Sequence, residues 1–393
     1  MHEDDCGCAH TPMEVDELNV DSNLLPSGLS ISSSIFNYRV ENGRTYHRYK
    51  DGSEHTTAPL SLFYLLLLRH QLTEYNIPND LAEQERLGKL LLLSTDTHTH
   101  TTIGMSPVIE GFTLTKTQDL QHNIFLLTFD DKLGFAPPCQ KGAEVGRVLD
   151  VGTGTGIWAV DFGDEHPEAE VLGIDLSPCR TTSVPPNVDF EVGDIEDEWI
   201  FDDDFDYIHS RMMTSSIADW KDYLQRCYEN LTPGGYLELQ ESDVMPSSDD
   251  GTIERSTSAL TKYCVLLLEA SVKLGRGYQD IPKLVDLMRD EIGFVDVEIK
   301  RYKWPVNAWP RDKRLQELGL WNGENLSAGL EAFAMAPFTR AHSWTRVEVE
   351  TFLVDVRREA RDQSIHAYWN IYSIVGRKPL RQDGDADPEP SSE

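Results

Sequence analysis

Three glycines alternate with other residues in the stretch 147–158, RVLDVGTGTGIW, directly after an apolar run of β type. A strand, a tight turn and a helix N-terminus in this order form a nucleotide-binding corner in α/β proteins. The dinucleotide fingerprint would need a further glycine in place of Ile157, and a phosphate-binding P-loop would need a lysine that this loop lacks. The spacing of Gly152, Gly154 and Gly156 therefore indicates another ligand, unless the turn is purely structural.

An acidic residue two positions before the first glycine narrows the choice of ligand. Asp150 places a carboxylate beside the loop, where it would repel a pyrophosphate and attract an ammonium or sulfonium group. S-adenosylmethionine has no phosphate and carries positive charge on its sulfur and its amine. We therefore predict that Asp150, Gly152, Thr153, Gly154 and Gly156 bind this cofactor.

The residues that follow have the order of a nucleotide-binding α/β sheet. Short apolar or alternating runs that predict strands cover residues 170–176, 188–194 and 205–210, and the first two end in or beside an acidic residue. A Pro-Gly-Gly turn in residues 231–241 leads into a further strand. Residues 219–230 between them predict an amphipathic helix. A repeated strand-and-helix order favours a cofactor site over a purely structural turn.

Acidic residues at the strand ends are candidates for contacts with the nucleoside. An acid that ends the second strand of such a unit reaches the ribose hydroxyls, which predicts this role for Asp175, followed by Leu176. Asp194 and Ile195 are expected to contact the adenine edge, one by hydrogen bonding and the other by apolar contact. Ser210, at the end of the strand over residues 205–210, completes the predicted cofactor-binding residues of the core.

The same motifs, together with segments outside the core, resemble the LaeA-like fungal S-adenosylmethionine-dependent methyltransferases. The resemblance covers most of the chain and rests on residues 148–162, 185–199, 205–213, 231–241, 32–52, 303–322 and 365–379. It implies a class I methyltransferase fold, which is α/β and Rossmann-like. In that fold the sheet is mostly parallel with an antiparallel last strand, and we expect a helical cap over the substrate side.

The resemblance divides the chain into five parts. We expect a disordered acidic N-terminus (1–31), an N-terminal cap segment (32–146) and the cofactor-binding core (147–301). Substrate-side helices and the last strand follow (302–379), and then a disordered acidic tail (380–393).

Two stretches interrupt the family-like N-terminal segment, at about residues 56–73 and 88–118. The second shows neither helical nor strand periodicity. Our hypothesis is that one or both are translated intron sequence or an error in the gene boundaries. Real surface loops are the alternative, because chain entropy tolerates long insertions.

The composition disfavours anionic partners. The chain has 35 basic and 67 acidic residues, a formal net charge of −32. Such a surface repels nucleic acids and anionic membranes, while basic regulatory partners remain electrostatically compatible. The run at 59–68 is strongly apolar but about half of the ~20 residues that a membrane helix needs. No signal peptide is evident, so we expect a cytoplasmic protein, with the nucleus as the alternative.

Sparse cysteines argue against a disulfide framework. Cys6, Cys8 and His10 lie close together, but three ligands in an acidic terminus make a poor metal site, and we predict none.

Methyl transfer from a sulfonium mainly requires positioning and exclusion of water, and a base is needed only for some acceptors. His209 is the candidate base, because it lies at the end of the predicted strand 205–210 and is expected to face the methyl group. The alternative is a histidine that positions the cofactor or satisfies backbone groups. Arg211, Met212 and Met213 are expected to line the substrate opening, and His122 to pack near the methionine end of the cofactor.

Aromatic residues in the family-like N-terminal segment could cover the cofactor. Tyr38, Tyr46 and His47 would then close over it, since an aromatic face attracts a sulfonium cation by ~1 kcal/mol. Equally, they could pack this segment onto the domain.

Three functions are compatible with these features. The first is methylation of a small-molecule acceptor in fungal secondary metabolism, as the resemblance implies. The second is a nuclear regulator that acts on or with protein partners, as some members of that family do. The third, a nicotinamide oxidoreductase, is disfavoured by the missing fingerprint glycine and by Asp150.

Overall fold

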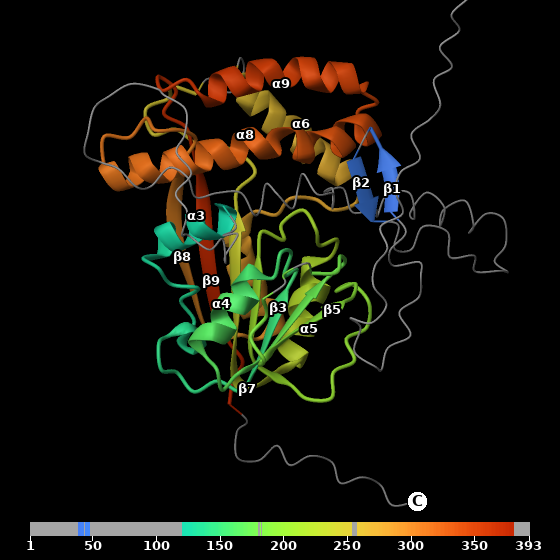
Figure 1. The fold of residues 1–393 in the computed structure, drawn as a ribbon, viewed down its shortest axis with the longest axis vertical. Helices are drawn as coiled ribbons and strands as arrows, with labels where there is room; N and C mark the ends of the chain where they lie inside the picture. Colours follow the sequence, from blue (N-terminus) through green and yellow to red (C-terminus); the bar gives the residue numbers. More distant parts are fainter. Residues whose placement is uncertain are drawn as a thin grey trace, which may run out of the picture.

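A computed structural model describes residues 38–42, 44–47, 120–179, 181, 183–253 and 258–380 (Figure 1). Both insertions and both predicted disordered ends lie outside these residues, as do Cys6, Cys8 and His10. The side chains of Tyr38 and His47 are not described either, although their backbones form part of a hairpin. The predictions made for these positions therefore stay predictions.

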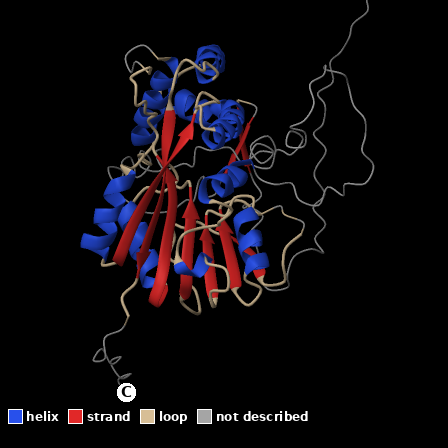
Figure 2. Ribbon diagram, turned by 90° about the vertical axis from the view of Figure 1, so that its left-hand side faces the viewer, coloured by secondary structure: helices blue, strands red, loops and turns tan. Residues whose placement is uncertain are grey.

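One seven-stranded sheet forms the centre of the molecule (Figure 2). The strand order is β5-β4-β3-β6-β7-β9-β8, and only β9 runs antiparallel to its two neighbours. The predicted class I methyltransferase architecture is therefore confirmed, including the last strand inserted beside the fifth strand of the unit. The strands are β3 (Arg147–Val151), β4 (Glu170–Asp175), β5 (Val188–Val192), β6 (Phe205–Arg211), β7 (Leu231–Ser242), β8 (Val295–Pro305) and β9 (Tyr368–Arg377).

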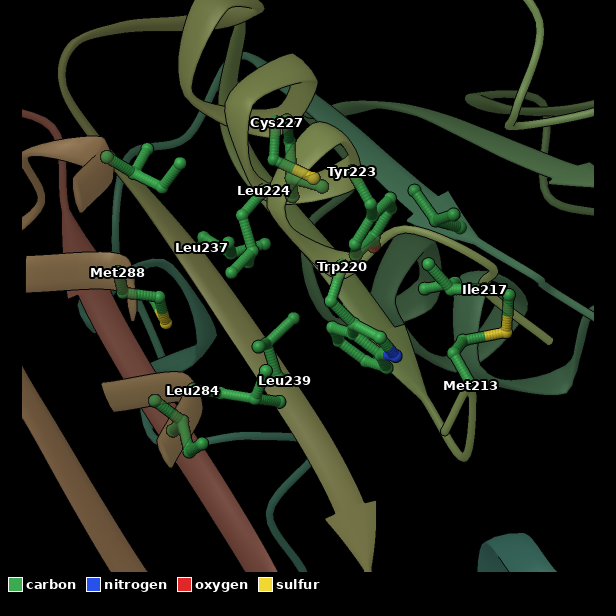
Figure 3. Packing of buried hydrophobic residues seen from close by; sticks show 14 of the residues in the cluster. Met213, Ile217, Trp220, Tyr223, Leu224, Cys227, Leu237, Leu239, Leu284 and Met288 are labelled. Carbon is green, nitrogen blue, oxygen red and sulfur yellow. The ribbon is translucent and has the colours of Figure 1, made fainter. Parts of the chain in front are cut away.

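Helices cover both faces of the sheet because its strands carry apolar side chains on both sides. In β6, Ile208 belongs to the apolar cluster beneath α5 (Trp220–Glu229), and Tyr207 belongs to the cluster beneath α4 (Ile157–Glu165). Figure 3 shows the α5 cluster, which also includes side chains of α7 (Ile281–Asp286) and its π-helical continuation η3 (Leu287–Ile292). Asp219 caps α5 and accepts hydrogen bonds from two backbone N–H groups.

Three helices form the predicted cap as a layer across one end of the sheet (Figure 1). They are α6 (Ala259–Lys273), α8 (Lys313–Ala341) and α9 (Arg346–Ala360), and they share one apolar cluster. The short α3 (Leu120–Phe129) packs beside α8 through a second cluster.

The hairpin of β1 (Tyr38–Glu41) and β2 (Arg44–His47) is attached to the cap. Arg340 of α8 bonds the Glu41 carboxylate at 2.9 Å, and its guanidinium lies 4.7 Å from the centre of the Tyr46 ring. Tyr46 is fully buried there and is not among the residues that line the main cavity. Of the two roles considered for Tyr46, the structure supports packing of the N-terminal segment.

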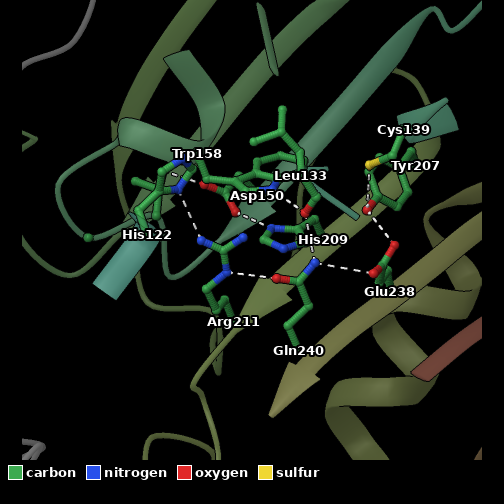
Figure 4. Close-up of polar contacts among 12 residues, drawn as sticks. His122, Leu133, Cys139, Asp150, Trp158, Tyr207, His209, Arg211, Glu238 and Gln240 are labelled. Carbon is green, nitrogen blue, oxygen red and sulfur yellow. Dashed lines mark hydrogen bonds and ion pairs between the residues drawn. The ribbon is translucent and has the colours of Figure 1, made fainter. Parts of the chain in front are cut away.

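A buried carboxylate joins the sheet to the segment that precedes it (Figure 4). Glu238 of β7 is fully buried on the α4 side of the sheet. Each of its oxygens lies within 3.2 Å of several donors. These donors are the backbone N–H groups of Phe135 and Ala136, the hydroxyls of Tyr207 and Ser373, and the amide of Gln240.

Within the described part of the chain, no helix has the length and apolar character that crossing a bilayer would require.

Candidate functional site

A cavity with a volume of about 330 Å³ lies where the carboxyl ends of the parallel strands meet the cap. This is the edge at which open α/β sheets bind ligands. The glycine loop forms part of its wall, and α6 and α8 form another part. One continuous space therefore joins the predicted cofactor site to the cap.

The three loop glycines have left-handed backbone conformations, with φ of 70° at Gly152, 60° at Gly154 and 82° at Gly156. A β-carbon at Gly152 would lie 2.4 Å from the Met213 sulfur, and one at Gly156 would lie 2.6 Å from the Phe190 ring. At Gly154 the nearest atom would be 4.0 Å away. Gly154 therefore presents bare backbone to the cavity.

Gly156 differs from the other two in its role. It is not among the cavity-lining residues, and its predicted contact with the ligand stays a prediction. Its position as the N-cap of α4, against Phe190, shows that it allows the loop to pack tightly on β5. Gly152, Thr153 and Gly154 do lie on the wall.

Asp175 holds the loop and faces the cavity at the end of β4. One oxygen accepts a hydrogen bond from the Gly154 N–H at 3.0 Å, and the other from the Ser177 N–H at 2.9 Å. Burial raises the pKa of Asp175, although these two backbone donors lower it. Leu176, Asp194 and Ile195 line the same part of the cavity, so their predicted placement is confirmed, while their contacts with the nucleoside stay a prediction.

Asp150 lies on the wall as predicted, but its oxygens are held by the protein. One accepts from the Thr153 hydroxyl at 2.6 Å and the other bonds Nδ1 of His209 at 2.8 Å (Figure 4). The carboxylate thus fixes the loop geometry while it remains at the edge of the cavity. Because a carboxylate oxygen can accept more than one hydrogen bond, Asp150 retains capacity for a cationic ligand.

His209 lies outside the wall of the cavity, whereas the sequence predicts that it faces the methyl group as the base. Its imidazole is fully buried, stacks on the Trp158 ring at 3.7 Å between centroids, and is not a lining residue. Burial lowers the pKa of His209, although Asp150 raises it, so the neutral ring donates Nδ1–H to Asp150. His209 therefore positions Asp150, which agrees with the alternative considered from the sequence. Ser210 is likewise buried and does not line the cavity, and its predicted contact with the cofactor stays a prediction.

A chain of polar contacts that the sequence did not predict forms another part of the wall (Figure 4). His122 of α3 bonds Asp161 through Nε2 at 3.0 Å, and its Nδ1 lies 3.1 Å from an Arg211 nitrogen. Arg211 also donates to the Gln240 side chain at 2.7 Å. An arginine can only donate, so Nδ1 of His122 accepts and the ring is the neutral Nε2–H form. Arg211, Met212 and Met213 line the opening as predicted.

The cap contributes residues that sequence reasoning did not single out. They come from successive turns of α6 and α8 and from the ends of β8 and β9. The members are Tyr263, Cys264, Leu267, Asn322, Asn325, Leu326, Phe333, Trp304 and Trp369. The sequence signal that could have indicated this part of the wall is the pair Asn322 and Asn325, one turn apart on an otherwise apolar face of α8.

A bidentate ion pair closes the nucleoside end of the cavity. Both terminal nitrogens of Arg276, which lies beyond α6, bond the two oxygens of Glu196 at 2.7 Å. Glu196 follows directly after Asp194 and Ile195, and it also accepts the Ala218 N–H at 2.7 Å. The cap is thereby joined to the loop that carries the predicted adenine contacts.

The charges on the wall fit a cationic cofactor. Four carboxylates line the cavity, those of Asp150, Asp175, Asp194 and Asp243, against the two guanidiniums of Arg211 and Arg276. Residues 152–156 contain no basic side chain that could neutralise a phosphate. Together with the open backbone at Gly154, this wall fits S-adenosylmethionine and disfavours a dinucleotide.

Comparison with known proteins supports this conclusion. Residues 120–281 match the family described as Methyltransferase domain. The methyltransferase pytC of Aspergillus terreus is 35% identical over 368 residues, which cover 93% of this chain and 95% of that protein. The chain belongs to the LaeA-like methyltransferases. It is an S-adenosylmethionine-dependent enzyme.

Two further relatives of this LaeA-like methyltransferase illustrate the range of the family. The probable methyltransferase tdiE of Emericella nidulans is 34% identical over 266 residues, covering 68% of this chain and 82% of that protein. The secondary metabolism regulator LAE1 of Cochliobolus heterostrophus is 36% identical over 265 residues, covering 66% and 86%.

We expect Asp175→Ala to weaken cofactor binding by about 10- to 100-fold, since hydrogen bonds to a charged group contribute ~1.5–3 kcal/mol. The substitution removes a wall carboxylate and the partner of the Gly154 N–H. Calorimetric titration with S-adenosylhomocysteine measures the change. Asp189→Ala, which removes an exposed carboxylate from neighbouring β5, is the matched control and should leave the affinity unchanged. Equal affinities in the two variants would contradict this role.

Stability should depend on pH through Glu241, which accepts the N–H groups of the cavity-lining Met213 and Thr214 at 2.9 and 3.1 Å. Burial raises the pKa of Glu241 from 4.5 to about 8, although these two bonds lower it. The folded state then holds a proton that the unfolded state releases. Stability is complete below the unfolded pKa and is lost as pH rises through the folded pKa.

The free energy of unfolding should therefore decrease between about pH 5 and pH 8, by at most about 1.4 kcal/mol per pH unit. Urea unfolding at several pH values measures this slope, and Glu241→Gln should flatten it. A wild-type stability that rises over this interval would contradict the assignment.

Proposed function

We propose that this protein methylates a small-molecule acceptor that binds between the glycine loop and the cap helices. The observation that carries the proposal is the continuous cavity lined by both Gly154 and the α8 residue Asn322. Its volume, about 330 Å³, lies within the range of small-molecule sites. The relatives named as methyltransferases, pytC and tdiE, support an enzyme acting in fungal secondary metabolism.

The residues of the chain supply binding, orientation and exclusion of water. When bound, S-adenosylmethionine supplies an electrophilic methyl group. Asp175, Asp194 and the backbone at Gly154 would hold its nucleoside, and Asp150 would favour its positive charge. The buried clusters of the cap keep water from the other half of the cavity. In such a reaction, alignment of donor and acceptor provides most of the acceleration.

Neither His209 nor any other side chain acts as a general base in the proposed reaction. His122 lines the cavity, but its Nδ1 lone pair already accepts a hydrogen bond from Arg211. An acceptor that is nucleophilic without deprotonation therefore fits this wall better than one that needs a strong base.

Isotope-labelled S-adenosylmethionine, incubated with the protein and with metabolite extracts of a strain lacking the gene, tests this function. We expect mass spectrometry to detect one labelled small molecule that is absent when the Gly154→Val variant is used. Label found only in protein would instead favour the regulatory role that the name of LAE1 suggests. In that outcome the small-molecule proposal is wrong.

A further inference from the structure

Two tryptophans form an apolar surface in the cavity on the side of β8 and β9. Trp304 and Trp369 are direct partners across the antiparallel pair, so their side chains lie on the same face of the sheet, and both line the cavity. Both indole N–H groups are already bonded, one to the Thr128 hydroxyl at 2.6 Å and the other to the Val244 carbonyl at 3.2 Å. The rings therefore offer only apolar surface, which suits a flat aromatic ligand.

A carboxylate that lines the same cavity, that of Asp243, lies at the end of β7. The Asp243 N–H donates to the Asn370 carbonyl at 3.0 Å, which fixes the backbone there. Its Oδ2 accepts from the Asn370 amide at 2.8 Å and from the Tyr372 hydroxyl at 3.1 Å. Burial raises the pKa of Tyr372 to about 12, and the Asp243 charge raises it too, so the phenol remains a donor.

The second oxygen of Asp243 is available to a ligand. Asp243 lines the cavity, and in the described part of the chain no donor bonds its Oδ1. Asn322 offers a similar atom from the cap: its Nδ2 donates to the Pro305 carbonyl at 2.9 Å, which leaves its carbonyl oxygen as an acceptor. Both groups would accept hydrogen bonds from a ligand rather than donate them.

The charge of the cavity argues against an anionic ligand in this position. Of its two arginines, Arg276 is paired with Glu196, and Arg211 bonds Gln240 and His122. A second carboxylate beside Asp243 would be repelled by the Asp243 charge.

From this arrangement we propose that Asp243 and the indole pair of Trp304 and Trp369 form the acceptor subsite. The subsite binds a flat, uncharged aromatic molecule and accepts a hydrogen bond from its hydroxyl or N–H group. This inference rests on the proposed function and names the class of acceptor that it uses. Asp243 orients the acceptor in this account.

Three naphthalene derivatives of nearly equal shape test the subsite without turnover. They are 2-naphthol, which carries a donor, 2-methoxynaphthalene, which lacks one, and 2-naphthoate, which is anionic. Each is titrated by fluorescence into the full-length protein saturated with S-adenosylhomocysteine. We expect 2-naphthol to bind about 10- to 100-fold more tightly than 2-methoxynaphthalene, because only 2-naphthol can donate a hydrogen bond to the charged Asp243 carboxylate. We expect 2-naphthoate to bind most weakly.

The substitution Asp243→Asn exchanges the acceptor for a donor. Its remaining oxygen can still accept from Asn370 and Tyr372, while its NH₂ group faces the cavity. We expect the preference for 2-naphthol to fall to less than about threefold and 2-naphthoate to gain affinity. Asp249→Asn is the matched control, because Asp249 bonds Lys303 and the Tyr368 hydroxyl and is not a lining residue.

The subsite is refuted if wild-type protein binds 2-naphthol no better than 2-methoxynaphthalene, or if none of the three binds. It is also refuted if Asp243→Asn and Asp249→Asn keep the same order of probes. Neither result depends on finding a methylated metabolite. Discrimination among the probes with no labelled metabolite in extracts would sustain the subsite and count against the proposed function.

Discussion

Gly154→Val should abolish detectable cofactor binding, with a loss of affinity of at least about 100-fold, while the protein stays folded. A β-carbon at this position would have no protein atom closer than 4.0 Å, so the added side chain projects into the cavity that Gly154 lines. It would occupy the space in which the cofactor approaches the backbone. Titration with S-adenosylhomocysteine measures the loss, and thermal unfolding shows whether the fold is retained.

A valine variant at a second glycine distinguishes obstruction of the cofactor site from backbone strain. Gly142 has a φ of 80°, a β-carbon added there would meet nothing within 4 Å, and it lies in a turn outside the cavity. Valine at either position adopts an unfavourable left-handed conformation, which costs ~1–3 kcal/mol. We therefore expect Gly142→Val and Gly154→Val to lose similar stability, with affinity lost only in the second. Cofactor binding that survives in Gly154→Val would show that the ligand lies elsewhere.

The cofactor half of the site was predictable because its residues lie at strand ends that are close in sequence. Asp175, Asp194 and the loop glycines each follow a short apolar strand, and parallel strands bring these ends to one edge. Backbone geometry alone nearly determines where such residues lie. The left-handed conformations of the loop explain why glycine is required there.

His209 lies outside the cavity wall for a specific reason. The sequence places it near the carboxyl end of its strand, but it does not show how far along the strand the cavity reaches. In the register of β3 and β6, His209 lies directly opposite Asp150, so the two side chains share a face and bond each other. The wall begins two residues later, at Arg211.

The acceptor half was unpredictable for a different reason. Its residues come from α6, α8, β8 and β9, and only the folded chain brings them together. On α8, Asn322 and Asn325 have the spacing of any buried helix face, so apolar periodicity cannot distinguish a cavity wall from a core. Asp243 is likewise one acid among 67 acidic residues, and only its two donors from β9 identify it.

Glu238→Ala should reduce the free energy of unfolding by about 3–5 kcal/mol, the cost of breaking a buried, hydrogen-bonded charge network. The substitution leaves the N–H groups of Phe135 and Ala136 without their acceptor, together with the Tyr207 and Ser373 hydroxyls. Each orphaned buried donor costs ~1–3 kcal/mol before the structure relaxes. Urea unfolding measures the change.

The comparison with Glu298→Ala isolates this effect, because Glu298 is an exposed glutamate in β8 of the same sheet and its loss should change stability by at most ~0.5 kcal/mol. Glu238→Gln should lie between the two, since its amide keeps one acceptor oxygen but turns an N–H group toward existing donors. Because Glu238 holds residues 135–136 against β7, its loss should also loosen the segment that carries Leu133, whose carbonyl accepts from Gln240. A Glu238→Ala variant as stable as Glu298→Ala would mean that water replaces the carboxylate at little cost, and the network would then have no role in holding this segment.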